Sequence, residues 1–529
     1  MKTVVLGGPG AGKTRYLVRQ VNRAVEKYGA DKVTVSSLTK AAATEISSRG
    51  LNVNPQSCGT LHAICYRGLD RPPLVYDAFA EFNEMYSRSL TVINKKRSTD
   101  DLESDVAGGH DDESLEEIDL LRALGRHQDT WPVGLQHFYS QYTAFKDFSG
   151  TCDFTDLLER AYVELPKGPF GDVSVVLHDE AQDSSPLEYQ LLSKWAETAE
   201  HTVLTGDDDQ SLFEWRGASI SGFLNFGDEK IIMGKSYRLP SVLLDYSKRW
   251  IEQLSYREPK SYEPRAEGGV ITTSRATIYN VDPVLDCVIE DYDAGRSVMI
   301  LTTCAYHLGA MVRRMKERGI PFHNPYRTKN GAWNPLRCSP GRASVVRTLL
   351  TQSSPPWSWG DLSKFFGYIN ASAMPRGLKS KLKRLGKNDD IIPFDTLRDI
   401  LGDSVMERML DNDQQWLLDS LLESKRKLFD YPVAVCKNLG TEKFRKHIDE
   451  IEGRTEHGIV VGTCHSTKGG QCDVTYIFPD LSKAGYKSYG DAALRDRVIR
   501  TFFVGLSRAR QKVVLCTQAN NCAVRWLSI

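Results

Sequence analysis

The sequence predicts an α/β protein with two parallel-sheet domains, each interrupted by a mainly helical insertion. Two blocks of short runs rich in β-branched residues alternate with amphipathic helical stretches. These runs are apolar almost throughout, which is typical of parallel strands covered by helices on both faces. We expect strands at 3–8, 32–37, 173–180 and 201–208 in the first block, and at 268–274, 297–303, 458–464, 473–478 and 512–517 in the second.

The strand pattern also divides the chain into domains. Each block contains one long gap in which the strand signal is absent and the pattern is mostly helical. We therefore expect a first sheet domain at 1–66 and 150–236 with an insertion at 67–149, and a second at 237–325 and 456–529 with an insertion at 326–455.

Two strongly charged stretches lie in these insertions. Residues 98–119 carry ten carboxylates and no Lys or Arg, and we favour a solvated acidic loop over an acidic partner-binding site. Residues 376–387 are basic and follow several aromatic residues. This second stretch either contacts nucleic acid or forms the solvated face of a helix over a small core.

The composition limits the class of protein. Among 529 residues, 68 Lys+Arg balance 68 Asp+Glu, so nucleic acid would have to be bound in a local groove rather than by a bulk basic field. The 11 cysteines include no pair at metal-site spacing, which favours free thiols in a reducing compartment. The chain has neither a signal-peptide pattern nor an apolar run of about 20 residues, so we expect a soluble, cytoplasmic protein without membrane contact.

The stretch "GGPGAGKT" at 7–14 predicts a phosphate-binding loop. It lies between an expected strand and an expected helix, where glycines let successive backbone N–H groups surround phosphate oxygens. Lys13 would reach the β- and γ-phosphates, and Thr14 would hold Mg²⁺. This strand–loop–helix context disfavours a chance glycine-rich turn. The expected loop residues are Gly7, Gly8, Pro9, Gly10, Ala11, Gly12, Lys13 and Thr14.

The stretch "VVLHDEAQD" at 175–183 predicts the second half of the nucleotide site. A buried strand that ends in two acids delivers them to its carboxyl edge. Asp179 would bind Mg²⁺ through the coordination shell of the ion, and Glu180 would orient and deprotonate an attacking water. On its own, a strand that ends in two acids is as often structural as functional. Together with the phosphate loop it predicts an ATPase or GTPase core.

The stretch "LTGDDDQSLFEWRGAS" at 204–219 combines two chemistries on one connector. Three carboxylates and a glutamine suit a metal or phosphate site, whereas Phe213, Trp215 and Arg216 suit stacking on a flat ring or base. A lone tryptophan is more often part of a core, so this interpretation depends on the motifs that accompany it.

These motifs, in this order, resemble those of the superfamily 1 DNA helicases of the UvrD/Rep type. The resemblance runs from Gly7 to Arg510, and seven or so motifs in sequence are highly specific. It implies two RecA-like motor domains. Besides the stretches quoted above, it includes "SLTKAAATEISSR" (37–49), "GTLHAICYR" (59–67), "CDFTDLLERA" (152–161), "KSYRLP" (235–240), "VGTCHSTKGGQCDV" (461–474) and "FFVGLSRARQK" (502–512).

The resemblance implies a role for individual residues, with ATP and Mg²⁺ as cofactors. Gln210 would sense the γ-phosphate and the water, and Arg238 and Arg508 would contact the γ-phosphate. Tyr237 would stack on adenine, and Gln471 would meet the ribose. The implied DNA-binding residues are Thr39, Lys40, Thr60, His62, Phe213, Trp215, Arg216, His465 and Lys468.

The function implied is an ATP-dependent helicase or translocase on single-stranded DNA and duplex junctions, moving 3′ to 5′ by family analogy, in repair or replication. The alternative is a DNA-dependent ATPase that translocates or removes bound proteins with little unwinding. A phosphotransferase with no polymer partner does not explain the two arginine motifs. Protein partners and oligomeric state stay open, and a monomer is compatible with the sequence.

The sequence also departs from the family pattern. Ser37 stands where the family has a base-stacking aromatic, so we expect Trp215 to carry more of the grip on DNA. Gln471 replaces an acidic residue, which we expect to weaken the ribose contact. Only Met1 to Leu6 precede the loop, so selection of ATP would fall on Tyr237.

Overall fold

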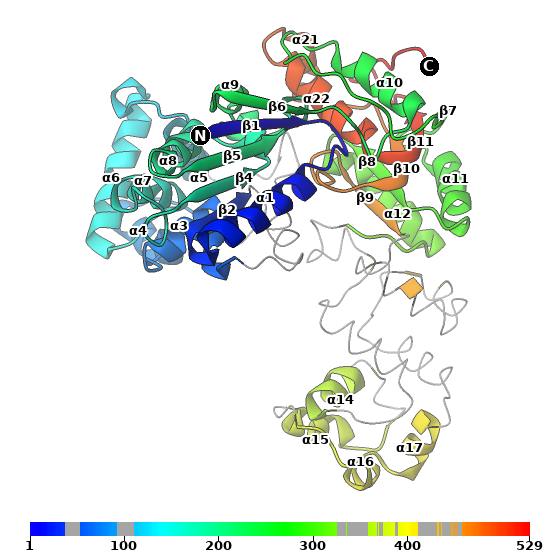
Figure 1. Ribbon diagram of the computed structural model, residues 1–529. Helices are drawn as coiled ribbons and strands as arrows, with labels where there is room; N and C mark the ends of the chain where they lie inside the picture. Colours follow the sequence, from blue (N-terminus) through cyan, green and yellow to red (C-terminus); the bar gives the residue numbers. More distant parts are fainter. Residues whose placement is uncertain are drawn as a thin grey trace.

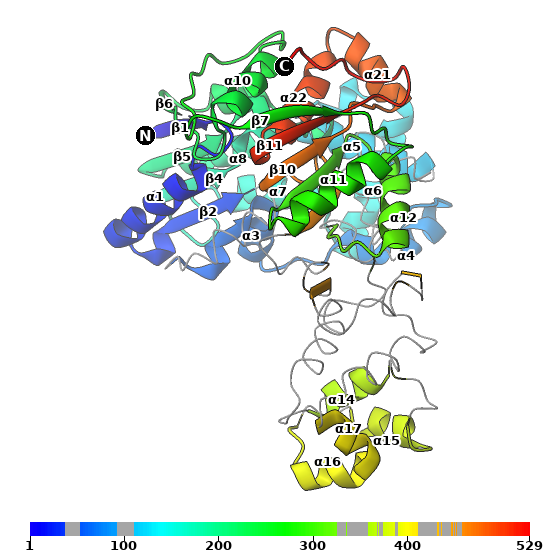
Figure 2. The same cartoon turned by 90° about the vertical axis from the view of Figure 1, so that its right-hand side faces the viewer.

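The computed structural model describes residues 1–37, 53–91, 110–324 and 458–529, and, between 325 and 457, residues 358–367, 374–386, 390–410 and a few single positions. Two α/β bodies lie side by side, and a group of short helices lies apart from both (Figures 1 and 2). Within the described part of the chain, no helix is long and apolar enough to cross a membrane.

The first sheet is parallel throughout and contains six strands in the order β3-β2-β4-β5-β1-β6. The four strands expected from the sequence are confirmed, and two edge strands, β3 and β6, join them. The strands are β1 (Lys2–Gly7), β2 (Val33–Ser37), β3 (Cys58–Thr60), β4 (Val175–Asp179), β5 (His201–Gly206) and β6 (Glu229–Met233).

Helices cover both faces of the first sheet, which explains why its central strands are apolar throughout. On one face α1 (Lys13–Tyr28) buries Leu17 and Val21 against the sheet. On the other, α8 (Pro186–Ala196) buries Trp195. The further helices of this domain are α3 (Leu61–Gly68), α7 (Phe154–Glu164) and α9 (Ile220–Leu224).

The second sheet is also parallel, with five strands in the order β7-β11-β10-β8-β9. All five strands expected from the sequence are confirmed: β7 (Val270–Ser274), β8 (Val298–Thr302), β9 (Ile459–Thr463), β10 (Cys472–Ile477) and β11 (Ala509–Cys516). The covering helices are α10 (Ser241–Ile251), α11 (Asp282–Asp293), α12 (Gly309–Arg318), α21 (Lys483–Gly490) and α22 (Arg495–Leu506). The predicted fold class, two parallel-sheet α/β domains, is therefore correct.

A helical insertion lies at the outer end of the first domain, away from the second sheet (Figure 1). Its helices α4 (Phe79–Tyr86), α5 (His110–Ala123) and α6 (Val133–Ser149) enclose an aromatic core that includes Phe82, Phe138 and Tyr142. Residues 110–119 of the acidic stretch form the start of α5 rather than a loop. The carboxylate of Asp111 accepts hydrogen bonds from the Ser89 backbone and side chain, at 2.7 and 3.0 Å. Residues 98–109 lie outside the described part.

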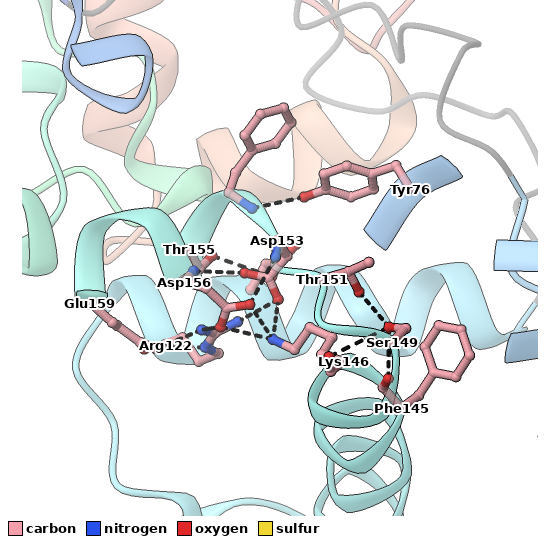
Figure 3. Close-up of polar contacts among 12 residues, drawn as sticks. Tyr76, Arg122, Phe145, Lys146, Ser149, Thr151, Asp153, Thr155, Asp156 and Glu159 are labelled. Atoms are coloured by element: carbon pink, nitrogen blue, oxygen red, sulfur yellow. Dashed lines mark hydrogen bonds and ion pairs between the residues drawn. The ribbon is translucent and has the colours of Figure 1, made fainter. Parts of the chain in front are cut away.

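Buried ion pairs join this insertion to α7 of the first domain (Figure 3). Arg122 of α5 contacts Asp153 at 2.8 Å and Asp156 at 2.6 Å, and Lys146 of α6 contacts Asp153 at 2.7 Å. Asp153 and Asp156 also form the capping box of α7. Because each buried charge has an opposite charge beside it, the junction avoids the cost of an isolated buried ion.

The described helices of the second insertion are α14 (Trp359–Phe366), α15 (Leu378–Leu385), α16 (Phe394–Leu401) and α17 (Asp403–Leu410). The basic stretch forms α15, whose Leu378 and Leu382 are buried. An amphipathic helix over a small core accounts for this pattern, and contact with nucleic acid stays a prediction. The domain boundaries expected from the sequence likewise stay predictions.

Candidate nucleotide site between the two sheets

The loop after β1 has the backbone geometry of a phosphate cradle. Gly10 and Gly12 have φ of 72° and 83°, a region that favours glycine. A Cβ on Gly8 would lie 2.5 Å from the Tyr262 ring, so this position has no room for a side chain. Lys13 donates from Nζ to the Gly7 carbonyl at 2.7 Å and closes the loop on itself. The loop thus presents backbone N–H groups and an ammonium at the amino end of α1.

Asp179, the last residue of β4, has the environment of a cation ligand. Burial, with the neighbouring Glu180 charge, raises its pKa to about 6. It accepts a hydrogen bond from Thr205 Oγ1 at 2.5 Å, and within the described residues it has no ion-pair partner. A buried carboxylate of this kind, with the Thr14 hydroxyl, offers the hard oxygen ligands that Mg²⁺ takes together with phosphate oxygens. These residues fit the metal that the sequence predicts.

Glu180 is held in a strained backbone conformation beside Asp179. Its φ is 56°, which is uncommon for a residue with a side chain. Its carboxylate accepts from Gln182 Nε2 at 2.7 Å and lies 3.5 Å from Lys468 Nζ. Burial opposes ionisation, but Lys468 and Lys13 lower the pKa of Glu180. The group is therefore ionised, as a general base must be.

Two cationic side chains from the second domain, Arg508 and Lys468, contact the polar residues of the first-domain site. Arg508 follows α22 and is fully buried, and its Nη2 donates to Gln210 Oε1 at 2.7 Å. Lys468, from the loop after β9, forms an ion pair with Asp183 and donates to the Gln210 carbonyl at 2.9 Å. The acids, the glutamine and the phosphate loop belong to the first sheet. The site is thus assembled from both domains.

The segment between the two sheets closes the same site from another side. Tyr237 donates its backbone N–H to the Gly10 carbonyl at 2.9 Å, and its ring is 65% exposed. Arg238 donates from Nε to Gln471 Oε1 at 3.3 Å. Burial and the neighbouring Arg508 lower the pKa of Arg238 to about 9. An exposed ring and two adjacent guanidinium groups therefore flank the phosphate loop.

Three of the residues predicted to bind DNA, Trp215, Arg216 and His62, lie near one another on the first domain. Trp215 and Arg216 lie in the short helix η7 (Glu214–Arg216), with the guanidinium 5.9 Å from the Trp215 ring centre. Burial lowers the pKa of His62, and the charge of Arg216 lowers it further. The His62 ring meets the exposed Phe154 ring edge-on at 6.2 Å.

The remaining residues predicted to bind DNA lie elsewhere. Thr60 caps α3 by accepting from the Ala63 N–H at 3.3 Å. Phe213 is buried against Val504 of the second domain, and His465 lies 6.4 Å from the Phe213 ring. Burial and Lys468 lower the pKa of His465 to about 4. Thr39 and Lys40 lie outside the described residues.

Several contacts between the two domains around the site were not expected from the sequence. Lys260, Arg257 and Tyr262 come from the segment between α10 and β7 and contact the first domain. Glu214 pairs with Arg500 of α22 at 2.7 Å. The one available signal was the run Asp207–Asp209, because three consecutive buried acids require cations nearby.

The fold and the site define a two-domain nucleotide-binding protein with a phosphate loop on one parallel sheet and an arginine supplied by the second. Residues 1–230 match the family described as "UvrD/REP helicase N-terminal domain", so this part of the chain is similar to the UvrD/Rep helicases. DNA helicase II of Escherichia coli (strain K12) is 25% identical over 370 residues, covering 62% of this chain and 49% of that protein.

Two further relatives agree with this placement. ATP-dependent DNA helicase PcrA of Leuconostoc citreum is 24% identical over 361 residues, covering 62% of this chain and 48% of that protein. The Bacillus subtilis (strain 168) protein YjcD is 21% identical over 604 residues, covering 98% of this chain and 77% of that protein. This chain spans about half the length of the helicase II and PcrA relatives that it matches.

Proposed function

We propose that the protein is an ATP-driven motor on single-stranded DNA that separates duplex strands. The observation that carries this proposal is the contact of Arg508 with Gln210, at 2.7 Å, beside the phosphate loop. Arg508 belongs to the second domain and Gln210 to the first. A nucleotide site that is complete only when two domains meet converts the presence or absence of the γ-phosphate into a domain movement.

The residues of the site then have separate tasks in hydrolysis. The loop N–H groups and Lys13 hold the phosphates, while Mg²⁺, held by Thr14 and Asp179, neutralises phosphate charge when bound. Glu180 accepts the proton of the attacking water. Gln210 orients that water, and Arg238 and Arg508 stabilise the charge that develops on the γ-phosphate.

A short path connects this site to the predicted DNA surface. Trp215 follows Gln210 by five residues in the same connector. Glu214, which lies between them, contacts Arg500 of α22, and α22 leads directly into Arg508. A base stacked on Trp215 is therefore connected to Arg508 through Glu214 and helix α22. Stacking tolerates any base, so we expect little sequence preference.

Strand displacement on tailed duplexes tests this proposal. We expect displacement with ATP on a duplex with a 3′ single-stranded tail and much less with a 5′ tail, with ATP preferred over GTP. DNA-stimulated hydrolysis without displacement would instead favour a translocase that removes bound proteins. Hydrolysis that is indifferent to DNA would contradict both functions.

A further inference from the structure

Lys260 is a buried lysine that contacts three consecutive aspartates of the first domain. Its side chain is completely buried, and its Nζ lies 3.0 Å from Asp207 Oδ1 and 3.1 Å from Asp209 Oδ2, with Asp208 also in contact. Burial opposes its charge, but the three carboxylates raise the pKa of Lys260. This arrangement holds the three carboxylates in place, but it removes water from all four charged groups, which costs free energy. Stability alone therefore does not account for it.

The first of these aspartates determines how the Gln210 side chain is oriented. Gln210 Nε2 donates to Asp207 Oδ2 at 2.6 Å, and Gln210 Oε1 accepts from Arg508 Nη2 at 2.7 Å. If the amide were rotated by half a turn, its N–H groups would face the arginine N–H and its oxygen would face the carboxylate. Both contacts would become repulsive, so an ionised Asp207 permits one orientation only.

Lys260 keeps Asp207 in the state that this orientation requires. It contacts Oδ1 and leaves Oδ2 free to accept from Gln210. Burial opposes the charge of Asp207, but Lys260 and Lys13 lower its pKa. Without Lys260, Asp207 would be repelled by the two neighbouring carboxylates or would become protonated. In either case its hold on the Gln210 amide is lost.

The segment that carries Lys260 crosses from the second domain to the first. It follows α10, which packs on the second sheet through Trp250. Two residues beyond Lys260, the Tyr262 ring lies against Gly8 of the phosphate loop. Lys260 is thus positioned by the second domain, as Arg508 is, and both act on Gln210 from opposite ends of its amide.

We propose that Lys260 is a positioning residue for ATP hydrolysis, acting through Asp207 to fix the amide of Gln210 toward Arg508. This role rests on the proposed function and assigns a task to a residue outside the motifs of the nucleotide site. It predicts that loss of Lys260 affects turnover and spares nucleotide binding.

The test is the steady-state ATPase of the full chain with saturating single-stranded DNA. We expect Lys260→Met to lower kcat by about tenfold to a hundredfold, the cost of a slightly misplaced catalytic group, with KM changed by about twofold at most. Lys260→Arg, which retains the charge, should recover most of the rate. Asp207→Asn should reproduce the loss, and it keeps the test decisive should Lys260→Met fail to fold.

Two controls separate positioning from a general effect on the acidic cluster. Arg257 contacts Asp209 at 2.8 Å and interacts with Asp207 only through its charge, without a hydrogen bond, so Arg257→Met removes one positive charge from the same cluster and should leave kcat within about threefold. In a Gln210→Ala background, Lys260→Met should lower kcat no further, because the two residues act as one unit.

The results that would overturn the role are specific. An equal loss of kcat in the Gln210→Ala background, or an equal loss from Arg257→Met, would show that Lys260 acts by another route. A change confined to KM would also contradict it. A wild-type chain without DNA-stimulated hydrolysis would instead overturn the proposed function, and this role with it.

Discussion

The ion pair between Glu214 and α22 should contribute to closure of the two domains. Glu214 Oε1 lies 2.7 Å from Arg500 Nη1, and its Oε2 lies 3.2 Å from Arg497 Nε. The side chains of Arg500 and Glu214 are 7% and 22% exposed. Glu214→Gln keeps the size of the side chain and removes its charge, so it weakens this contact without creating a cavity.

The magnitude follows from the burial of the pair. An exposed ion pair contributes about 0.2–1 kcal/mol, and a fully buried charge that loses its partner costs about 3–5 kcal/mol. Glu214 lies between these limits, so we expect closure to lose about 1–2 kcal/mol. This corresponds to a factor of about 5–30 in the ratio of closed to open molecules. ATP turnover with DNA should fall by up to this factor, because in the proposed mechanism Arg508 acts on Gln210 only when the domains are closed.

A double-mutant cycle with Arg500→Gln measures this contribution in DNA-stimulated ATP turnover. The two changes should be strongly non-additive, because each removes the same contact. Glu197→Gln is the matched control, since Glu197 pairs with Lys194 at 2.8 Å on the surface of one domain, and it should leave turnover unchanged. Additive losses, or a Glu214→Gln chain that turns over as fast as wild type, would refute the reasoning.

Three further predictions concern stability, DNA and the nucleotide. Burial and the charge of Asp153 raise the pKa of Asp119 from 3.8 to about 7. Between these two pH values the folded state therefore binds more protons than the unfolded state. The free energy of unfolding thus falls as pH rises from about 4 to about 7. Asp119→Asn should remove this loss, so thermal unfolding should show the variant gaining up to about 4 kcal/mol over wild type between pH 4 and pH 8. An equal difference at both pH values would contradict the cause. Trp215→Ala should weaken binding of a labelled single strand by about fivefold or more, as expected for loss of one stacked base, whereas an unchanged Kd would indicate a role in packing. Tyr237→Ala should weaken ATP binding but not competition by inorganic triphosphate, which lacks a ring to stack; equal weakening of both would contradict a role in base recognition.

The sequence predicted every strand of the second sheet and the four central strands of the first, but it missed both edge strands of the first sheet. The four central strands of the first sheet and β8, β9 and β10 of the second are buried along most of their length, whereas β7 is largely exposed and was recognised from its β-branched residues. β3 is only three residues long, and β6 is largely exposed and begins with Glu229 and Lys230. β3 is too short to show a pattern and β6 starts with two charges, so neither has the apolar, β-branched run from which the other strands were recognised.

The candidate site shows the same division. Asp179, Glu180 and the phosphate loop could be predicted because local strand–turn geometry brings them to one sheet edge. Lys260 could not, since its contacts with Asp207 join residues 53 positions apart, with no characteristic spacing. Phe213 was predicted from its chemistry as a DNA platform, and the structure places it in the contact between the two domains. Burial at such a contact depends on domain arrangement, which local patterns do not carry.

ATP hydrolysis measured with and without single-stranded DNA, for the wild type and for Glu180→Gln, tests the central claim most directly. The claim is that a nucleotide site shared by two domains is coupled to a DNA track. It predicts that DNA raises the wild-type rate strongly, and that Glu180→Gln abolishes turnover while ATP and DNA still bind. A wild-type rate that does not respond to DNA, or a Glu180→Gln chain that still hydrolyses ATP, would contradict it.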